Sequence, residues 1–180
     1  MNKIESGEKL DFNNVLIRPK RSTINSRSEV SLERTFKFKH SYLTWTGIPI
    51  IAANMDTTGT FEVYNCLKKH KIVTAFHKFY TVEDYQKYDT YMSHLDPDYF
   101  MISTGISDND FEKLKQILGK INCNWICIDI ANGYISNLVE YCKKVRKEFP
   151  DKIIIAGNVV TREMVEQLIL EGGVDIVKVG

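Results

Sequence analysis

The segment that decides the fold runs from residue 125 to residue 157 and reads WICIDIANGYISNLVEYCKKVRKEFPDKIIIAG. It begins and ends with short, nearly continuous apolar runs, at residues 125–129 and 153–157. Runs of this length and character are typical of parallel strands that are buried on both faces. Between them the sequence is amphipathic, so we expect a strand, a helix and a second strand, which together form a βαβ unit.

The amphipathic stretch between the two runs has helical periodicity. Its apolar side chains recur at intervals of three and four residues: Ile135, Leu138, Val139, Cys142, Val145 and Phe149. This spacing places them on one face of a helix, with lysines on the opposite face. Pro150 ends the helix, because its ring cannot continue the hydrogen-bonding pattern.

The same alternation extends outward from this unit in both directions. Further apolar runs lie at residues 49–54, 73–77, 99–103 and 176–180. Four helical patterns lie between them. The first covers residues 60–71, and the second follows Thr81 and contains Tyr85, Tyr88 and Met92. The third follows Ser107 and contains Phe111, Leu114 and Leu118, and the fourth contains Met164, Val165 and Leu168. Two architectures fit this pattern, a doubly wound open sheet and a (β/α)8 TIM barrel. A complete barrel needs about 250 residues, so the second reading implies that only about the first six strands are present.

The N-terminal region follows a different pattern, and we expect it to form a separate arm or hairpin over residues 1–48, with the incomplete barrel at 49–180. Residues 28–39 alternate between apolar and polar side chains, with Val30, Leu32, Phe36 and Phe38 on one face. Strict alternation predicts a half-exposed antiparallel strand across this whole stretch.

Composition narrows the class of protein. Of the 180 residues, 43% are apolar and 26% are charged, and the net charge is +1, which gives no electrostatic reason to expect nucleic acid or an anionic membrane as partner. There is no apolar run of about 18 residues and no apolar signal sequence at the N-terminus, so we expect a cytoplasmic protein. The four cysteines, Cys66, Cys123, Cys127 and Cys142, are expected to be buried reduced thiols, and their spacing predicts no metal site in this chain.

Polar residues follow the predicted strands at the ends where parallel α/β sheets bind their ligands. Asn54-Met55-Asp56 follows the first run, Lys78 the second, Ser103 ends the third and Asp129 ends the fourth. A carboxylate at position 129 could accept the hydroxyls of a ribose or, alternatively, cap the following helix. Lys78 could donate to a phosphate or carbonyl and move a proton, or it could be an ordinary solvated lysine.

The N-terminal arm offers a second group of candidate binding residues. Ser26 and Arg27 lie in a segment rich in arginine, serine and threonine, where a guanidinium and a hydroxyl together suit a phosphate. The same segment could also be a solvated basic face. The sequence contains no Gly-x-Gly-x-x-Gly motif, so a Rossmann type of dinucleotide site is not expected.

Five segments together resemble the IMP dehydrogenase/GMP reductase family, and within it the GMP reductase branch. They are residues 10–19 (LDFNNVLIRP), 51–62 (IAANMDTTGTFE), 76–78 (FHK), 129–134 (DIANGY) and 156–161 (AGNVVT). Their order extends the resemblance from residue 10 to residue 180. An IMP dehydrogenase usually carries an inserted CBS module, for which the passage from Met92 to Tyr99 leaves no room, and it usually lacks a lysine at position 78.

The resemblance implies a TIM barrel that reduces GMP to IMP and ammonia with NADPH through a covalent intermediate on a cysteine. It implies that Ser26 and Arg27 contact NADPH phosphates, that Lys78 is catalytic and lies at the cofactor, and that Asp129, Ile130, Ala131 and Gly180 also bind NADPH. Asn54, Met55 and Asp56 would form the purine-side floor for GMP.

The resemblance also implies that part of the site lies outside this chain. The nucleophilic cysteine of the family, and possible coordination of a monovalent cation such as potassium, belong to a loop that would follow Gly180. The chain alone is therefore expected to be inactive, and the complete protein to be a tetramer. Two other readings are an IMP dehydrogenase-like oxidoreductase that uses NAD and a shortened, non-catalytic nucleotide-binding protein.

Overall fold

A computed structural model describes residues 6–180 and divides the chain into two units, residues 1–31 and 32–180. In the first unit, residues 6–31 are all exposed and contain two 3-10 helices, Phe12–Asn14 and Arg27–Glu29. Asp11 caps the first and Ser26 caps the second through side-chain oxygens. Among the helices of residues 6–180, none has the length and apolar character needed to cross a membrane.

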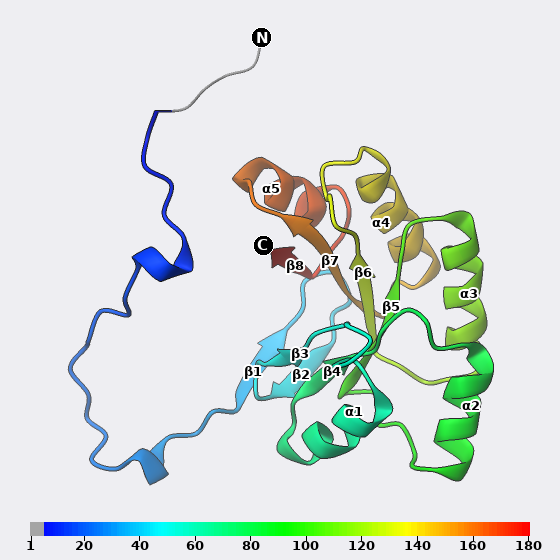
Figure 1. The fold of residues 1–180 in the computed structure, drawn as a ribbon, viewed down its shortest axis with the longest axis horizontal. Helices are drawn as coiled ribbons and strands as arrows, with labels where there is room; N and C mark the ends of the chain where they lie inside the picture. The colour runs from blue at the N-terminus through cyan, green and yellow to red at the C-terminus, as the bar shows by residue number, and fades with distance from the viewer. Residues whose placement is uncertain (1–5) are drawn as a thin grey trace. The chain divides into compact units, whose positions relative to one another are not determined.

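The second unit contains eight strands and five α-helices (Figure 1). The strands are β1 (Arg34–Lys37), β2 (Thr44–Gly47), β3 (Ile51–Ala52), β4 (Val73–Ala75), β5 (Phe100–Thr104), β6 (Trp125–Asp129), β7 (Ile153–Val159) and β8 (Ile176–Val179). The helices are α1 (Phe61–Leu67), α2 (Val82–Tyr91), α3 (Asp108–Leu118), α4 (Asn137–Glu148) and α5 (Arg162–Leu170), and a 3-10 turn, Lys68–His70, follows α1.

The order of the strands decides between the two predicted architectures. Strands β3 to β8 form one sheet in the order β3-β4-β5-β6-β7-β8, and every neighbouring pair is parallel. A doubly wound sheet reverses its strand order at a switch point, whereas this order never reverses. Figure 1 shows the five helices in an arc around the strands. The sheet is therefore a curled half-barrel of six strands, which confirms the TIM-barrel prediction.

The predicted helix starts agree with capping residues in the structure. Thr81 and Asp84 form a capping box at α2, and Ser107 and Asp110 form one at α3. The predicted helical stretch that contains Met92 is α2, which ends at Tyr91, so that Met92 is its C-cap residue and is exposed. The buried face of α2 presents Tyr85 and Tyr88, and the Tyr88 ring stacks on Phe61 of α1 at 4.1 Å between centroids.

The antiparallel hairpin β1–β2 packs against the amino ends of the barrel strands. The Trp45 ring meets the Trp125 ring edge-on at 5.5 Å, and its indole nitrogen donates to the carbonyl of Asp98 at 2.9 Å. The predicted strand over residues 28–39 is too long, since the observed strand covers only Arg34–Lys37 and most of the predicted apolar face is exposed. Alternation forms a ladder only where a partner exists, and β2 pairs with four residues.

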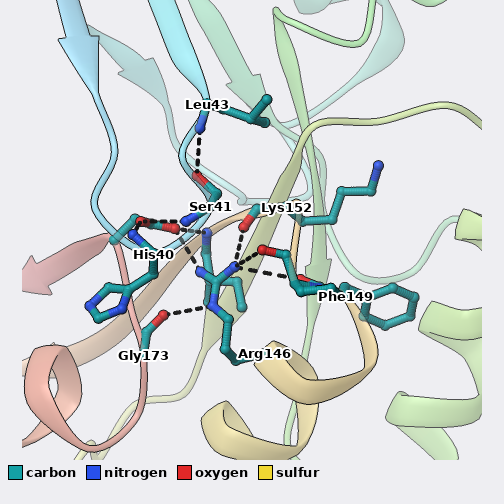
Figure 2. Close-up of polar contacts among 10 residues, drawn as sticks. His40, Ser41, Leu43, Arg146, Phe149, Lys152 and Gly173 are labelled. Atoms are coloured by element: carbon teal, nitrogen blue, oxygen red, sulfur yellow. Dashed lines mark hydrogen bonds and ion pairs between the residues drawn. The ribbon is translucent and has the colours of Figure 1, made fainter.

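One buried ion pair connects the hairpin, the end of α4 and the start of β8 (Figure 2). The Asp175 carboxylate is fully buried and accepts from Arg146 at 2.6 Å and from the backbone N–H of His40 at 2.9 Å. Arg146 also donates to the carbonyls of Lys152, at 2.7 Å, and Gly173, at 2.9 Å. Both charges are thus paired and hydrogen-bonded, which is the arrangement that makes a buried ion pair tolerable.

We expect Arg146→Met to lower the free energy of unfolding by about 3–5 kcal/mol, because it leaves the buried Asp175 carboxylate without its cation. Equilibrium urea unfolding, followed by circular dichroism, measures the change. The control is Arg162→Met, which breaks the exposed pair with Glu166 and should cost less than about 1 kcal/mol. Equal costs for the two variants would show that the buried pair does not hold this end of the barrel together.

Candidate active site

A cavity of about 300 Å³ lies at the carboxyl ends of the strands, where ligand sites of such barrels are found. It is lined by Asn54, Met55, Asp56, Lys78, Phe79, Ser103, Thr104 and Asp129. A larger cavity, of about 480 Å³, lies between the hairpin and the amino ends of the strands. Its walls are mostly apolar, and its one carboxylate, Asp175, is already paired with Arg146. The smaller, polar cavity is therefore the candidate site.

Three side chains from distant parts of the sequence form a closed polar network beside this cavity. The amide of Asn54 donates to Asp129 Oδ2 at 2.8 Å. The ammonium of Lys178 pairs with Asp129 Oδ1 and donates to Asn54 Oδ1 at 3.3 Å. Asn54 follows β3, Asp129 ends β6 and Lys178 lies in β8. Asp129 is thus an ion-pair partner and not a cap of the following helix, the alternative that its sequence position left open.

Glycine at position 157 allows β8 to approach β7 closely at this point. A Cβ atom at Gly157 would lie 2.7 Å from the Cβ of Lys178 and would also collide with the Lys178 carbonyl. The register between β7 and β8 shifts between Ala156 and Val159, next to this contact. A larger residue at position 157 would push β8 away and separate Lys178 from Asp129.

Lys78 follows β4 and is exposed on the cavity wall. Its backbone carbonyl accepts from the ammonium of Lys113 in α3 at 2.7 Å. Burial lowers the pKa of Lys113 from its ordinary value. This hydrogen bond restrains the main chain at Lys78, the residue whose side-chain ammonium is exposed at the cavity.

Ser103 supplies a buried hydroxyl to the same wall. Among residues 6–180 its Oγ has no oxygen or nitrogen partner. The Cys127 thiol is its one side-chain neighbour in hydrogen-bonding contact, and a sulfur partner is weak, so a polar group of a ligand in the cavity could still bond to this hydroxyl.

Comparison with known proteins shows the family of the chain. The domain model for the IMP dehydrogenase / GMP reductase domain matches residues 9–180. The chain belongs to this family. Over 179 residues, it is 55% identical to a GMP reductase of Citrobacter koseri and 56% identical to one of an Enterobacter species (strain 638). Each match covers 99% of this chain and 51% of the relative. The chain therefore spans about half the length of these curated relatives.

A solved structure gives the same picture of the fold. The chain superposes on inosine 5′-monophosphate dehydrogenase from Legionella pneumophila with a TM-score of 0.76 and 26% sequence identity. The match covers 94% of this chain and 50% of that one. The chain therefore shares its fold with part of that dehydrogenase.

The structure brings together only part of the set of residues that the family resemblance implied. Asn54, Met55, Asp56, Lys78 and Asp129 line one cavity. Of the other members, Ile130 exchanges backbone hydrogen bonds with Gly157 and Asn158, Ala131 is exposed, and Gly180 donates to the Val159 carbonyl. Ser26 and Arg27 belong to the first unit. The roles of all these residues stay predictions.

The sequence reasoning missed Lys178. The apolar run Ile-Val-Lys-Val predicts a buried strand, and a charged residue inside such a run is itself a signal. Lysine is almost never fully buried unless it is paired, so its presence there required an acidic partner. The sequence could not show which carboxylate that partner was.

The prediction that all four cysteines are buried is wrong for Cys66, which is exposed on α1. Helical spacing identified the helix correctly, but Cys66 faces away from the core. Burial raises the pKa of the other three thiols, to about 12 for Cys123 and Cys142 and to about 11 for Cys127. These thiols are protonated near neutral pH, which makes them poor nucleophiles.

We expect a thiol reagent such as iodoacetamide, at about pH 8, to modify Cys66 alone in the folded protein. The other three residues should react only after unfolding, because they are buried and their raised pKa values keep them protonated. Mass spectrometry of tryptic peptides, with and without denaturant, locates the adducts. Rapid labelling of Cys127 under native conditions would contradict the packing described for β6.

Proposed function

We propose that this chain is the N-terminal portion of an NADPH-dependent GMP reductase and carries six strands of its barrel. The reaction converts GMP, NADPH and two protons into IMP, NADP⁺ and ammonium. The sequence identities support this choice over IMP dehydrogenase. The chain is 55–56% identical to two curated GMP reductases and 26% identical to the dehydrogenase on which its structure superposes. The observation that carries the proposal is the cavity at the carboxyl ends of the strands, which holds Lys78, Asn54 and Asp129 together.

The donor and acceptor groups of the cavity fit part of the cofactor. Its volume, about 300 Å³, suits one nucleoside-sized group and not a whole dinucleotide. Bound NADPH would supply the hydride that replaces the purine amino group. Asp129 would accept hydroxyls of the nicotinamide ribose, and the Ser103 hydroxyl lies in the same wall as an available donor or acceptor. Ile130, Ala131 and Gly180 would continue this contact, while Ser26 and Arg27 would bind phosphate oxygens.

On the substrate side, Asn54, Met55 and Asp56 would form the floor beneath the purine of GMP. Asn54 carries both a donor and an acceptor, which is what a purine edge requires. Lys78 would give a proton to the departing ammonia, which converts a poor leaving group into a good one. Its held backbone and exposed ammonium suit that role.

The covalent step would require a thiolate that bonds to C2 of the purine before ammonia leaves. Cys123, Cys127 and Cys142 are buried and protonated, and Cys66 lies on α1 outside the residues that line the cavity. The family resemblance implies that the nucleophile belongs to a loop that would follow Gly180, and a potassium site at the same loop is part of this proposal. Residues 6–180 contain no group of three or more His, Cys, Asp or Glu that could hold a metal ion. The tetrameric state and the cytoplasmic location stay predictions.

The proposal is tested by completing the barrel with the second half of the Citrobacter koseri relative, either fused or co-expressed. We expect the completed barrel to oxidise NADPH when GMP is added and to release IMP and ammonia, while the 180-residue chain alone shows no turnover. Absorbance of NADPH and chromatography of the nucleotides measure the reaction. Reduction of NAD⁺ with IMP instead would identify a dehydrogenase, and tight binding of GMP without turnover would identify a non-catalytic nucleotide-binding protein.

In the completed barrel, Lys78→Met should lower kcat by at least about 100-fold, which is the usual contribution of a positioned proton donor. Lys120→Met is a matched control, because Lys120 is an exposed lysine beyond the end of α3 and outside the cavity. Steady-state kinetics with GMP and NADPH compare the two variants. Similar rates for both would remove Lys78 from the reaction.

A further inference from the structure

Lys178 touches the candidate site only through other residues. The cavity at the carboxyl ends of the strands is lined by Asn54 and Asp129, and Lys178 does not line it. Lys178 lines a separate space of about 210 Å³ inside the half-barrel, with Met101, Cys127 and Ile155 around it. The stem of Lys178 therefore lies beside apolar residues of the interior, while its ammonium contacts Asn54 and Asp129.

Lys178 and Asn54 together constrain both oxygens of the Asp129 carboxylate. Oδ1 receives the Lys178 ammonium, and Oδ2 receives the Asn54 amide at 2.8 Å. The ammonium also holds the oxygen of that same amide, at 3.3 Å, so each of the three groups contacts the other two. A carboxylate held at both oxygens has one orientation, and its remaining lone pairs point in known directions.

The positive charge of Lys178 also offsets the negative charge of the Asp129 carboxylate. The side chains of Lys178 and Asp129 are 26% and 27% exposed, so both charges are largely removed from water. A carboxylate in this setting is costly without a cation, and it would also repel the phosphates of a nucleotide ligand. Pairing with Lys178 makes the site close to neutral while leaving Asp129 able to accept hydrogen bonds.

We propose that Lys178 is a positioning residue that orients the Asp129 carboxylate and so sets the affinity of the site for the ribose hydroxyls of the cofactor. The inference rests on the proposed function, because it takes Asp129 as the acceptor for that ribose. Preorganisation of this kind strengthens binding, since the orientation of the acceptor is fixed before the ligand arrives.

The test is a double-mutant cycle in the completed barrel, with Lys178→Met, Asp129→Asn and the double variant. NADPH binding is measured by fluorescence titration, and KM for GMP is measured alongside. Lys178→Met should raise the Kd for NADPH by about tenfold, equivalent to about 1.4 kcal/mol, with KM for GMP changed by less than about twofold. In the Asp129→Asn background the same substitution should change Kd by less than about twofold, because no carboxylate remains to be oriented.

Lys178→Arg is the conservative comparison and should keep the Kd within about threefold of wild type, because a guanidinium can pair with the same carboxylate. Circular dichroism and thermal melting establish that each variant is folded. If Lys178→Met does not fold, Lys178→Gln, which keeps a donor and removes the charge, takes its place in the cycle.

Three outcomes separate the claims. Coupling between positions 178 and 129 in NADPH binding supports the positioning role. Additive effects, or an equal rise in KM for GMP, overturn it while leaving the reductase proposal intact. A wild-type barrel that binds no NADPH overturns the proposed function and, with it, this inference.

Discussion

The parallel pairing of β6 with β7 is the constraint on which the rest of the structure depends. Five consecutive residue pairs join these strands, from Trp125 opposite Ile153 to Asp129 opposite Gly157. Most of their side chains are fully buried, so a shift of one residue would turn the apolar set away from its partners. The same register places Asp129 opposite Gly157. Because Gly157 has no side chain, β8 can approach closely enough for Lys178 to reach Asp129.

The two ends of the sheet have opposite character. At the amino ends, the hairpin covers the strands with aromatic rings, and the buried Arg146–Asp175 pair connects three segments. At the carboxyl ends, polar side chains surround a cavity, and the buried Ser103 hydroxyl lies in its wall. Rigidity at one end and available hydrogen-bonding groups at the other is the division expected of a barrel in which loops carry the chemistry.

The network of Asn54, Asp129 and Lys178 also connects the two edge strands of the sheet. Asn54 follows β3, which begins the sheet, and Lys178 belongs to β8, which ends it. These strands are 124 residues apart in the sequence at this contact. A polar bridge across the interior is therefore a tertiary restraint on the curvature of the half-barrel, in addition to its effect on the site.

The sequence by itself determined the elements and their class. Buried parallel strands have to be continuous apolar runs, helices have to show their period, and caps such as Thr81 have to precede them, so these features were visible without a structure. It also placed Asn54, Lys78 and Asp129 at one edge, because parallel strands share a carboxyl end.

Only the tertiary structure decided the rest. Strand order, which separates a half-barrel from a doubly wound sheet, depends on which strands pair and not on any local pattern. The exposure of Cys66 and the shortening of the strand at Arg34–Lys37 depend on which partners are present. The role of Lys178 depends on its contacts with Asp129, which is 49 positions away in the sequence, and with Asn54, which is 124 positions away. No periodicity in a linear sequence encodes such distances, because they are set by how the sheet curls.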